Sequence, residues 1–123
     1  MKNIVIVDDS SSARMFIQRC FEVSGFEGAN FIEANNGKEA VSVLESQSVD
    51  LVVTDLTMPE MDGTELLKWI KGNSKFAKTP VVVITSSGNE AKKQELVDIG
   101  AFSVLTKPIS PAIIAKVITP INK

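Results

Sequence analysis

A chain of 123 residues, 44% of them hydrophobic, is long enough to form one packed core without help from disulfides or metals. The formal net charge of −2 comes from acids and bases mixed along the chain, which argues against a nucleic-acid-binding surface. Cys20 is the only cysteine, so no intramolecular disulfide can form, and no apolar stretch approaches the roughly 20 residues of a membrane-spanning helix. We therefore predict one cytoplasmic domain over residues 1–123, with proteins or small ions as partners, no nucleic acid and no membrane insertion.

Five short segments have the composition of β-strands. They are expected at Asn3–Val7, Asn30–Ala34, Leu51–Thr54, Val81–Thr85 and Ser103–Thr106. The first, third and fourth consist almost entirely of Val, Ile and Leu, which is typical of parallel strands that are covered on both faces. The sequence therefore indicates a parallel sheet buried between two layers.

Helical patterns follow the strands. Apolar periodicity, helix-forming residues and punctuation predict five helices, around residues 13–21, 39–44, 65–70, 91–99 and 113–121. Gly25 and Gly100 stand where a glycine would end a helix, and Ser110 before Pro111 is a helix N-cap followed by proline at the first helical position. The helices and strands therefore alternate along the whole chain.

This alternation predicts an α/β fold of the doubly wound, flavodoxin-like (βα)5 type. We expect a five-stranded parallel sheet of order 2-1-3-4-5, with helices on both faces. In such a sheet the first and third strands are neighbours, and the functional crevice lies at their carboxyl ends. Asp8 and Asp9 follow the first strand and Asp55 follows the third, so the topology predicts that the three acids meet.

Three neighbouring carboxylates cannot all ionise without a cation to balance them. Oxygen ligands with no histidine or thiolate nearby favour Mg²⁺. Lys107, after the fifth strand, adds a positive charge, and Pro108 directly after it suggests a fixed peptide bond, cis or trans, that aims the lysine side chain. Thr85, at the end of the fourth strand, adds a hydroxyl group. These groups suit phosphoryl transfer, with Asp55 as the nucleophile that becomes an aspartyl phosphate.

Over essentially its whole length the sequence resembles a response regulator receiver domain of the chemotaxis single-domain type. Five motifs, in order, carry the resemblance: Asp8-Asp9, Asp55, Met58-Pro59 with Asp62-Gly63, Thr85 and Lys107-Pro108. The resemblance implies a signalling protein of a two-component system rather than a conventional enzyme. It also implies that Asp55 takes its phosphoryl group from a histidine on a sensor kinase or a histidine phosphotransfer protein, which agrees with the absence of histidine from this chain.

The resemblance also assigns roles to single residues. The implied Mg²⁺ ligands are Asp9, Asp55, the backbone carbonyl of Thr57 and, acting through water, Asp8. Lys107 would pair with the acyl phosphate, and Thr85 would donate a hydrogen bond to a phosphoryl oxygen. A downstream protein would bind the surface formed by the fourth helix, fifth strand and fifth helix, and a phosphatase is a further possible partner.

The sequence departs from the family pattern at one position. Val104 stands three residues before Lys107, where the family usually has an aromatic residue that moves together with the threonine. Because valine has few rotamers and a small surface, we expect this coupling to be weakened, with Phe102 as a partial substitute on the same strand face. Thr57 and Ser87 occupy positions that in the family tune how fast the phosphoryl group is lost. Both are small hydroxyl residues, which predicts moderate or slow self-dephosphorylation.

Other functions remain open on the sequence alone. A flavodoxin-like electron carrier shares the fold class, although Asp8 and Asp9 would repel a flavin phosphate. A hydrolase with Asp55 as its nucleophile would need a second acid two residues later, where Thr57 stands. A receiver that serves as a phosphorelay shuttle or a phosphate sink would keep the same site.

Overall fold

The computed structural model of the protein describes residues 2–86 and 88–121 and contains a five-stranded parallel sheet. The strand order is β2-β1-β3-β4-β5, which confirms the predicted order. The strands are β1 (Asn3–Val7), β2 (Asn30–Ala34), β3 (Leu51–Asp55), β4 (Val81–Thr85) and β5 (Ser103–Thr106). Four of them have the predicted bounds. The third is one residue longer than predicted, because the backbone of Asp55 continues the ladder opposite Ile84.

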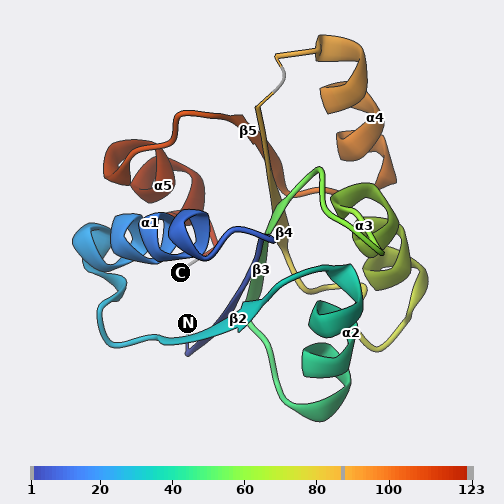
Figure 1. The fold of residues 1–123 in the computed structure, drawn as a ribbon, viewed down its shortest axis with the longest axis horizontal. Coiled ribbons are helices and arrows are strands. Elements are labelled where there is room, and N and C mark those ends of the chain that lie inside the picture. Colours follow the sequence, from blue (N-terminus) through green and yellow to red (C-terminus); the bar gives the residue numbers. More distant parts are fainter. Residues whose placement is uncertain (1, 87, 122–123) are drawn as a thin grey trace.

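Helices cover both faces of the sheet (Figure 1). Their bounds are α1 (Ser11–Phe21), α2 (Gly37–Ser46), α3 (Gly63–Gly72), α4 (Glu90–Ile99) and α5 (Pro111–Ile118). The helices α1 and α5 lie on one face, and α2, α3 and α4 lie on the other. None of the helices in the described residues is long and apolar enough to cross a membrane.

Short polar side chains set where the helices begin. The N-cap side chains that accept a hydrogen bond from a first-turn amide are Ser10, Asn36, Asp62, Asn89 and Ser110. Gly100, with φ of 132°, ends α4, and Ser110 precedes Pro111 in α5, as predicted. Regular α1 ends at Phe21, as predicted, and Gly25 has φ of 103°, as expected of a terminating glycine; the π-helical turn over Glu22–Phe26 that lies between them was not predicted.

The three central strands, β1, β3 and β4, are buried from both sides. In β1, Ile4 and Ile6 face the layer under α1 and α5, whereas Val5 and Val7 face the layer under α2, α3 and α4, and all four side chains are fully buried. Cys20, on the inner face of α1, packs in the first of these layers. With apolar side chains on both faces, the ends of the strands are where the sheet can present polar groups.

Candidate functional site

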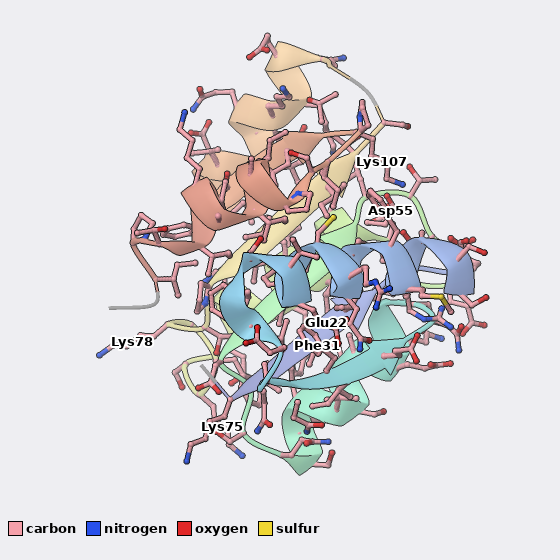
Figure 2. The ribbon with its side chains drawn as sticks, turned by 90° about the vertical axis from the view of Figure 1, so that its left-hand side faces the viewer. Glu22, Phe31, Asp55, Lys75, Lys78 and Lys107 are labelled. Atoms are coloured by element: carbon pink, nitrogen blue, oxygen red, sulfur yellow. The ribbon has the colours of Figure 1, made fainter. Side chains whose placement is uncertain are left out.

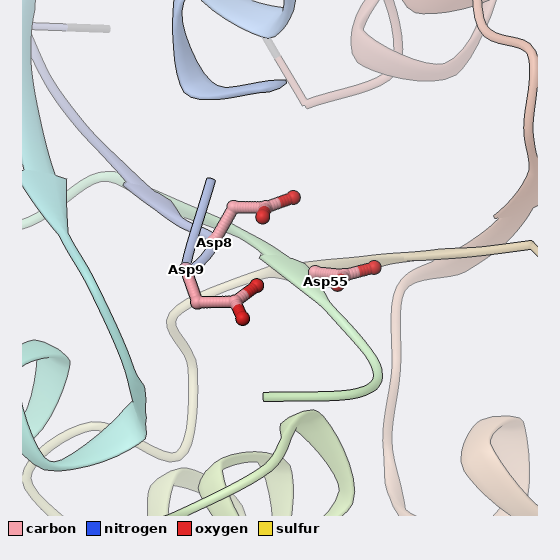
Figure 3. Close-up of side chains that lie close together, drawn as sticks. All are labelled: Asp8, Asp9 and Asp55. Atoms are coloured by element: carbon pink, nitrogen blue, oxygen red, sulfur yellow. The ribbon is translucent and has the colours of Figure 1, made fainter. Parts of the chain in front are cut away.

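Three acids meet at the carboxyl-end edge of the sheet (Figure 3). Asp8 and Asp9 come from the turn between β1 and α1, and Asp55 is the last residue of β3. Each offers a carboxylate oxygen, and these oxygens all lie within 4.8 Å of one another. The predicted convergence is therefore confirmed, and it follows from the pairing of β1 with β3 at the centre of the sheet.

Asp8 is the buried member of the group, with a relative exposure of 2%. One carboxylate oxygen, Oδ1, accepts a hydrogen bond from the backbone amide of Ser10 at 2.9 Å. The other, Oδ2, is buried without a hydrogen-bond partner among the described residues. Burial raises the pKa of Asp8, and the neighbouring charges of Asp55 and Asp9 raise it further, against the opposing effects of the Ser10 amide and of Lys107. The unpartnered oxygen is thus free to meet a cation or its bound water.

Asp55 is paired with the lysine that the sequence singled out. The Lys107 Nζ lies 3.4 Å from Asp55 Oδ1, and the two side chains are 38% and 13% exposed. Figure 2 shows the two labelled residues near one another at the same end of the sheet. The Lys107 amide donates to the Thr85 carbonyl at 2.8 Å, which ties the end of β5 to β4. The Lys107-Pro108 bond, whose isomer the sequence left open, is cis.

The remaining candidate residues lie around this edge. Thr85 ends β4 and is 5% exposed. Thr57 lies two residues beyond Asp55 and is exposed. Val104 is half-buried against the core under α2, α3 and α4, whereas Phe102 is 45% exposed at the opposite end of β5. The prediction for Ser87 lies outside the described residues.

Gly63 matters through its backbone, a role that motif matching alone did not explain. Its amide donates to the Leu56 carbonyl at 2.8 Å, which brings the start of α3 against the end of β3. A Cβ atom at Gly63 would collide with the carbonyl oxygen of Asp55 and lie 2.9 Å from Leu56 Cα. Only glycine therefore allows α3 to begin directly beside the backbone of Asp55.

Arg14 was missed altogether by reasoning from the sequence. It lies in the first turns of α1 and its guanidinium reaches back to the carbonyl oxygen of Asp8. An arginine within an amphipathic helix is an ordinary surface residue by pattern, so no signal in the sequence distinguishes it. Only the packing of α1 against the end of β2 reveals this contact.

The donor set fits a hard divalent cation. The three acids supply only oxygen ligands, and one of these oxygens is buried without a partner. Three carboxylates and the single ammonium of Lys107 leave two negative charges in excess, which one divalent cation would balance. The edge can therefore hold a metal ion next to a carboxylate that is exposed enough to react.

A doubly wound parallel sheet that gathers acids, a lysine and a threonine at one edge defines a class of proteins, the phosphoacceptor receivers of two-component signalling. The model of the response regulator receiver domain family matches residues 4–119, and this chain belongs to that family. It is 33% identical over 122 residues to the chemotaxis protein CheY of Thermotoga maritima, an alignment that covers 99% of this chain and 98% of the relative.

Solved structures agree with this assignment. The CheX-CheY-BeF3-Mg²⁺ complex of Borrelia burgdorferi matches with a TM-score of 0.87 and 30% identity, over 99% of this chain and 90% of that one. The Mn²⁺-bound form of response regulator Rcp1 matches with a TM-score of 0.79 and 28% identity, over 95% and 89% of the two chains. The chain is thus a CheY-like receiver of two-component signal transduction, and nothing in these comparisons supports an electron carrier.

Proposed function

We propose that Asp55 of this chain accepts a phosphoryl group from a phosphohistidine on a partner protein, and that the modified chain signals through altered protein contacts. The observation that carries the proposal is the contact between Lys107 Nζ and Asp55 Oδ1, 3.4 Å long, inside a cluster of acids. The ammonium marks one carboxylate of the three as the place where additional negative charge can be accommodated. It supports Asp55 as the acceptor and Asp8 with Asp9 as the metal-holding pair.

The transfer itself is a displacement at phosphorus. A carboxylate oxygen of Asp55 forms a bond to phosphorus while the P–N bond of the phosphohistidine breaks, and its electron pair returns to the imidazole nitrogen, which takes up a proton. Lys107 would pair with a phosphoryl oxygen, and the hydroxyl of Thr85 would donate to another. The donor lies outside residues 1–123, which contain no histidine.

Mg²⁺ belongs to the same proposal. Its ligands would be carboxylate oxygens of Asp9 and Asp55 and the backbone carbonyl of Thr57, with Asp8 acting through water. When bound, Mg²⁺ supplies positive charge close to the phosphoryl oxygens. The Borrelia CheY complex contains Mg²⁺ and the Rcp1 structure is an Mn²⁺-bound form, which supports a divalent cation here.

An apolar depression beside Lys107 supports a protein as the phosphoryl donor. It lies between α1 and the segment after β5, and its lining is Ala13, Phe16, Ile17, Ile84, Lys107, Pro108 and Ile109. Half of the Phe16 side chain is exposed there, and Met15 beside it is 71% exposed. A small-molecule phosphate ester would gain nothing from such a wall, whereas an apolar side chain beside a phosphohistidine would be buried by it.

For the downstream partner we propose the surface formed by α4, β5 and α5. Val97 on α4 and Phe102 just before β5 are 48% and 45% exposed, which leaves apolar area for a partner to cover. The same proposal includes two expectations about the switch: Val104 weakens the coupling to Thr85, and Thr57 and Ser87 make self-dephosphorylation moderate or slow. It also includes a single domain over residues 1–123, a cytoplasmic location and a phosphatase as a further partner. A phosphorelay shuttle or phosphate sink uses the same chemistry and differs only in the recipient.

The test is incubation with acetyl phosphate and Mg²⁺, followed by intact mass measurement. We expect wild-type protein to gain one phosphoryl group that hydroxylamine removes, and Asp55→Asn to gain none. Asp50→Asn, which changes an aspartate at the opposite edge of the sheet, is the matched control and should behave as wild type. An equal gain of mass in Asp55→Asn would rule out Asp55 as the acceptor.

A further inference from the structure

The Arg14 side chain is 11% exposed and makes three contacts near the acids. Its Nη1 donates to the carbonyl oxygen of Asp8 at 2.6 Å and to Asn35 Oδ1 at 2.9 Å. Its Nε donates to Glu33 Oε1 at 2.8 Å. One guanidinium from α1 therefore joins the turn after β1 to the end of β2.

We propose that Arg14 is a positioning residue for the metal site: it fixes the peptide plane between Asp8 and Asp9, so that their carboxylates are arranged for a divalent cation before the ion binds. The inference rests on the proposed function, since it concerns the same site. Arg14 does not touch the ion or the phosphoryl group. It acts through the backbone of its neighbours.

The carbonyl that Arg14 holds belongs to the peptide bond that links the two acids. Rotation of that peptide plane would swing the Asp9 side chain relative to Asp8 and Asp55. The preceding amide, that of Asp8, donates to the Ala34 carbonyl at 3.0 Å, so the residue is fixed on both sides of its Cα. No hydrogen bond to the Asp9 carboxylate is seen within residues 2–86 and 88–121, so its position depends on its backbone.

The effect of Arg14 is one of geometry rather than of net charge. Glu33 pairs with the guanidinium at 2.8 Å and offsets its charge, whereas Lys107 is the cation that contacts Asp55. Asn35, the third partner of Arg14, is itself held by α2, because its backbone amide donates to Glu39 Oε1 at 2.9 Å. The guanidinium that bonds the Asp8 carbonyl is thus held in place by contacts to β2 and, through Asn35, to α2.

The three contacts require donors that diverge from a rigid plane. A guanidinium provides them with little loss of side-chain freedom, because its fork is planar and already oriented. A lysine at the same place would keep the charge and three donors, but all of them leave one nitrogen, whereas Arg14 reaches its acceptors from two separate nitrogens, Nε and Nη1. Arg14→Lys therefore removes the planar guanidinium but keeps the positive charge and most of the buried aliphatic stem.

The experiment measures Mg²⁺ binding directly, by calorimetry and by amide chemical shifts in NMR titrations, without any phosphoryl donor. We expect Arg14→Met to weaken Mg²⁺ binding about tenfold, at the lower end of the range for residues that orient metal ligands, and Arg14→Lys to weaken it less, by about threefold. Glu33→Gln keeps an oxygen that accepts from Nε, so its affinity should stay within about twofold of wild type. The order parameter of the Asp9 amide in metal-free protein should fall in both Arg14 variants.

Lys71→Met is the matched control. Lys71 also donates to two backbone carbonyls, those of Ala77 and Thr79, but it does so at the opposite edge of the sheet. Its replacement should lower stability and leave Mg²⁺ affinity unchanged. If Arg14→Met binds Mg²⁺ as tightly as Lys71→Met, the inference is wrong.

Two further outcomes also decide the question. Wild-type Mg²⁺ affinity in Arg14→Lys would mean that the positive charge, rather than the planar guanidinium, matters, and it would overturn the inference. This outcome can be measured even if Arg14→Met does not fold. A wild-type protein that binds no Mg²⁺ would instead count against the proposed function itself. The failure of the inference and the failure of the proposed function are thus distinguishable.

Discussion

At the amino ends of the strands, Asp50 Oδ2 accepts hydrogen bonds from the backbone amides of Lys2 and Asn3 at 3.0 and 2.9 Å, whereas at the carboxyl ends Asp8 keeps one buried oxygen without a partner. These amides lower the pKa of Asp50, that of Asn3 most. Burial and the neighbouring acids raise the pKa of Asp8. The same side chain is thus stabilised as an anion at one edge and destabilised as an anion at the other.

The lysines of the two edges differ in the same way. Lys71 donates to the carbonyls of Ala77 and Thr79 at 3.1 and 2.7 Å, and its burial lowers its pKa. Lys107 makes one longer contact, to Asp55, and stays 38% exposed. In Figure 2 the loop of Lys75 and Lys78 lies across the molecule from Asp55 and Lys107. Asp50 and Lys71 at the amino-end edge each bond two backbone groups, whereas Asp8 and Lys107 at the carboxyl-end edge have fewer partners among the described residues.

The largest effect is expected from a methyl group placed at the carboxyl-end edge. Gly63→Ala should lower the free energy of unfolding by about 2–3 kcal/mol, because its Cβ would collide with the backbone of Asp55 and the start of α3 would have to move. Mg²⁺ affinity should fall with it, since Asp55 moves too. Urea unfolding and a Mg²⁺ titration measure the two effects.

The other end of the same helix provides the control. A Cβ atom at Gly72, the last residue of α3, would meet nothing within 4 Å. Gly72→Ala should therefore leave stability unchanged or raise it by about 0.5 kcal/mol, since alanine favours the helix. Equal losses in the two variants would show that the edges do not differ in the way described.

Removing a charge from the acid cluster should raise stability. In metal-free protein at pH 7, Asp8→Asn should gain about 1–2 kcal/mol, because it relieves repulsion among carboxylates that lie within 4.8 Å. The folded-state pKa of Asp8 is raised, so the wild-type penalty is present above that pKa and disappears as the pH falls toward the unfolded value. The advantage of the variant should therefore shrink in acid. Urea unfolding of both proteins with a chelator, repeated at several pH values, tests this, and a variant less stable than wild type at pH 7 would contradict it.

The corresponding change at the amino-end edge should have the opposite sign. Asp50→Asn should lose about 1 kcal/mol at pH 7, since a charged acceptor of two backbone amides is replaced by a neutral one. The folded-state pKa of Asp50 is lowered, so its contribution is present above the unfolded value and is lost as the pH falls through the folded one. In the same unfolding series, wild type should be more stable than Asp50→Asn at pH 7, and this difference in the free energy of unfolding should disappear in acid. A variant that gains stability at pH 7 would remove the contrast between the edges.

How much of this could be predicted depends on the range of the interactions involved. The strands could be located because continuous Val, Ile and Leu runs are a local pattern, and the strand order followed from the strict alternation with helices. The starts of α2 and α3 were predicted two residues late. Their N-caps, Asn36 and Asp62, are short polar residues next to glycines, a signal that is weak in the sequence and clear once the capping hydrogen bonds are known.

The candidate site likewise contains features that the sequence could predict and features that it could not. The meeting of Asp8, Asp9 and Asp55 could be predicted, because topology alone brings the ends of neighbouring strands together. Arg14 and Gly63 could not be assigned their roles, because each role depends on how closely a helix approaches a strand end. Such distances are set by the packing of whole elements, which no short motif encodes.

The smallest expected effect concerns the backbone of the loop after β3, and it extends the comparison from charges to conformation. Glu60, in the loop between β3 and α3, has φ of 67°, whereas Gly25 and Gly100, which precede the amino ends of β2 and β5, take up positive φ as glycines. A left-handed conformation costs a residue with a side chain roughly 1 kcal/mol, and replacement by glycine removes this cost. Part of the resulting gain in stability is lost, because glycine also makes the unfolded chain more flexible. Glu60→Gly should therefore raise stability by about 0.5 kcal/mol in urea unfolding. If the variant is instead less stable than wild type, then Glu60 is not strained and the carboxyl-end edge carries no conformational cost of this kind.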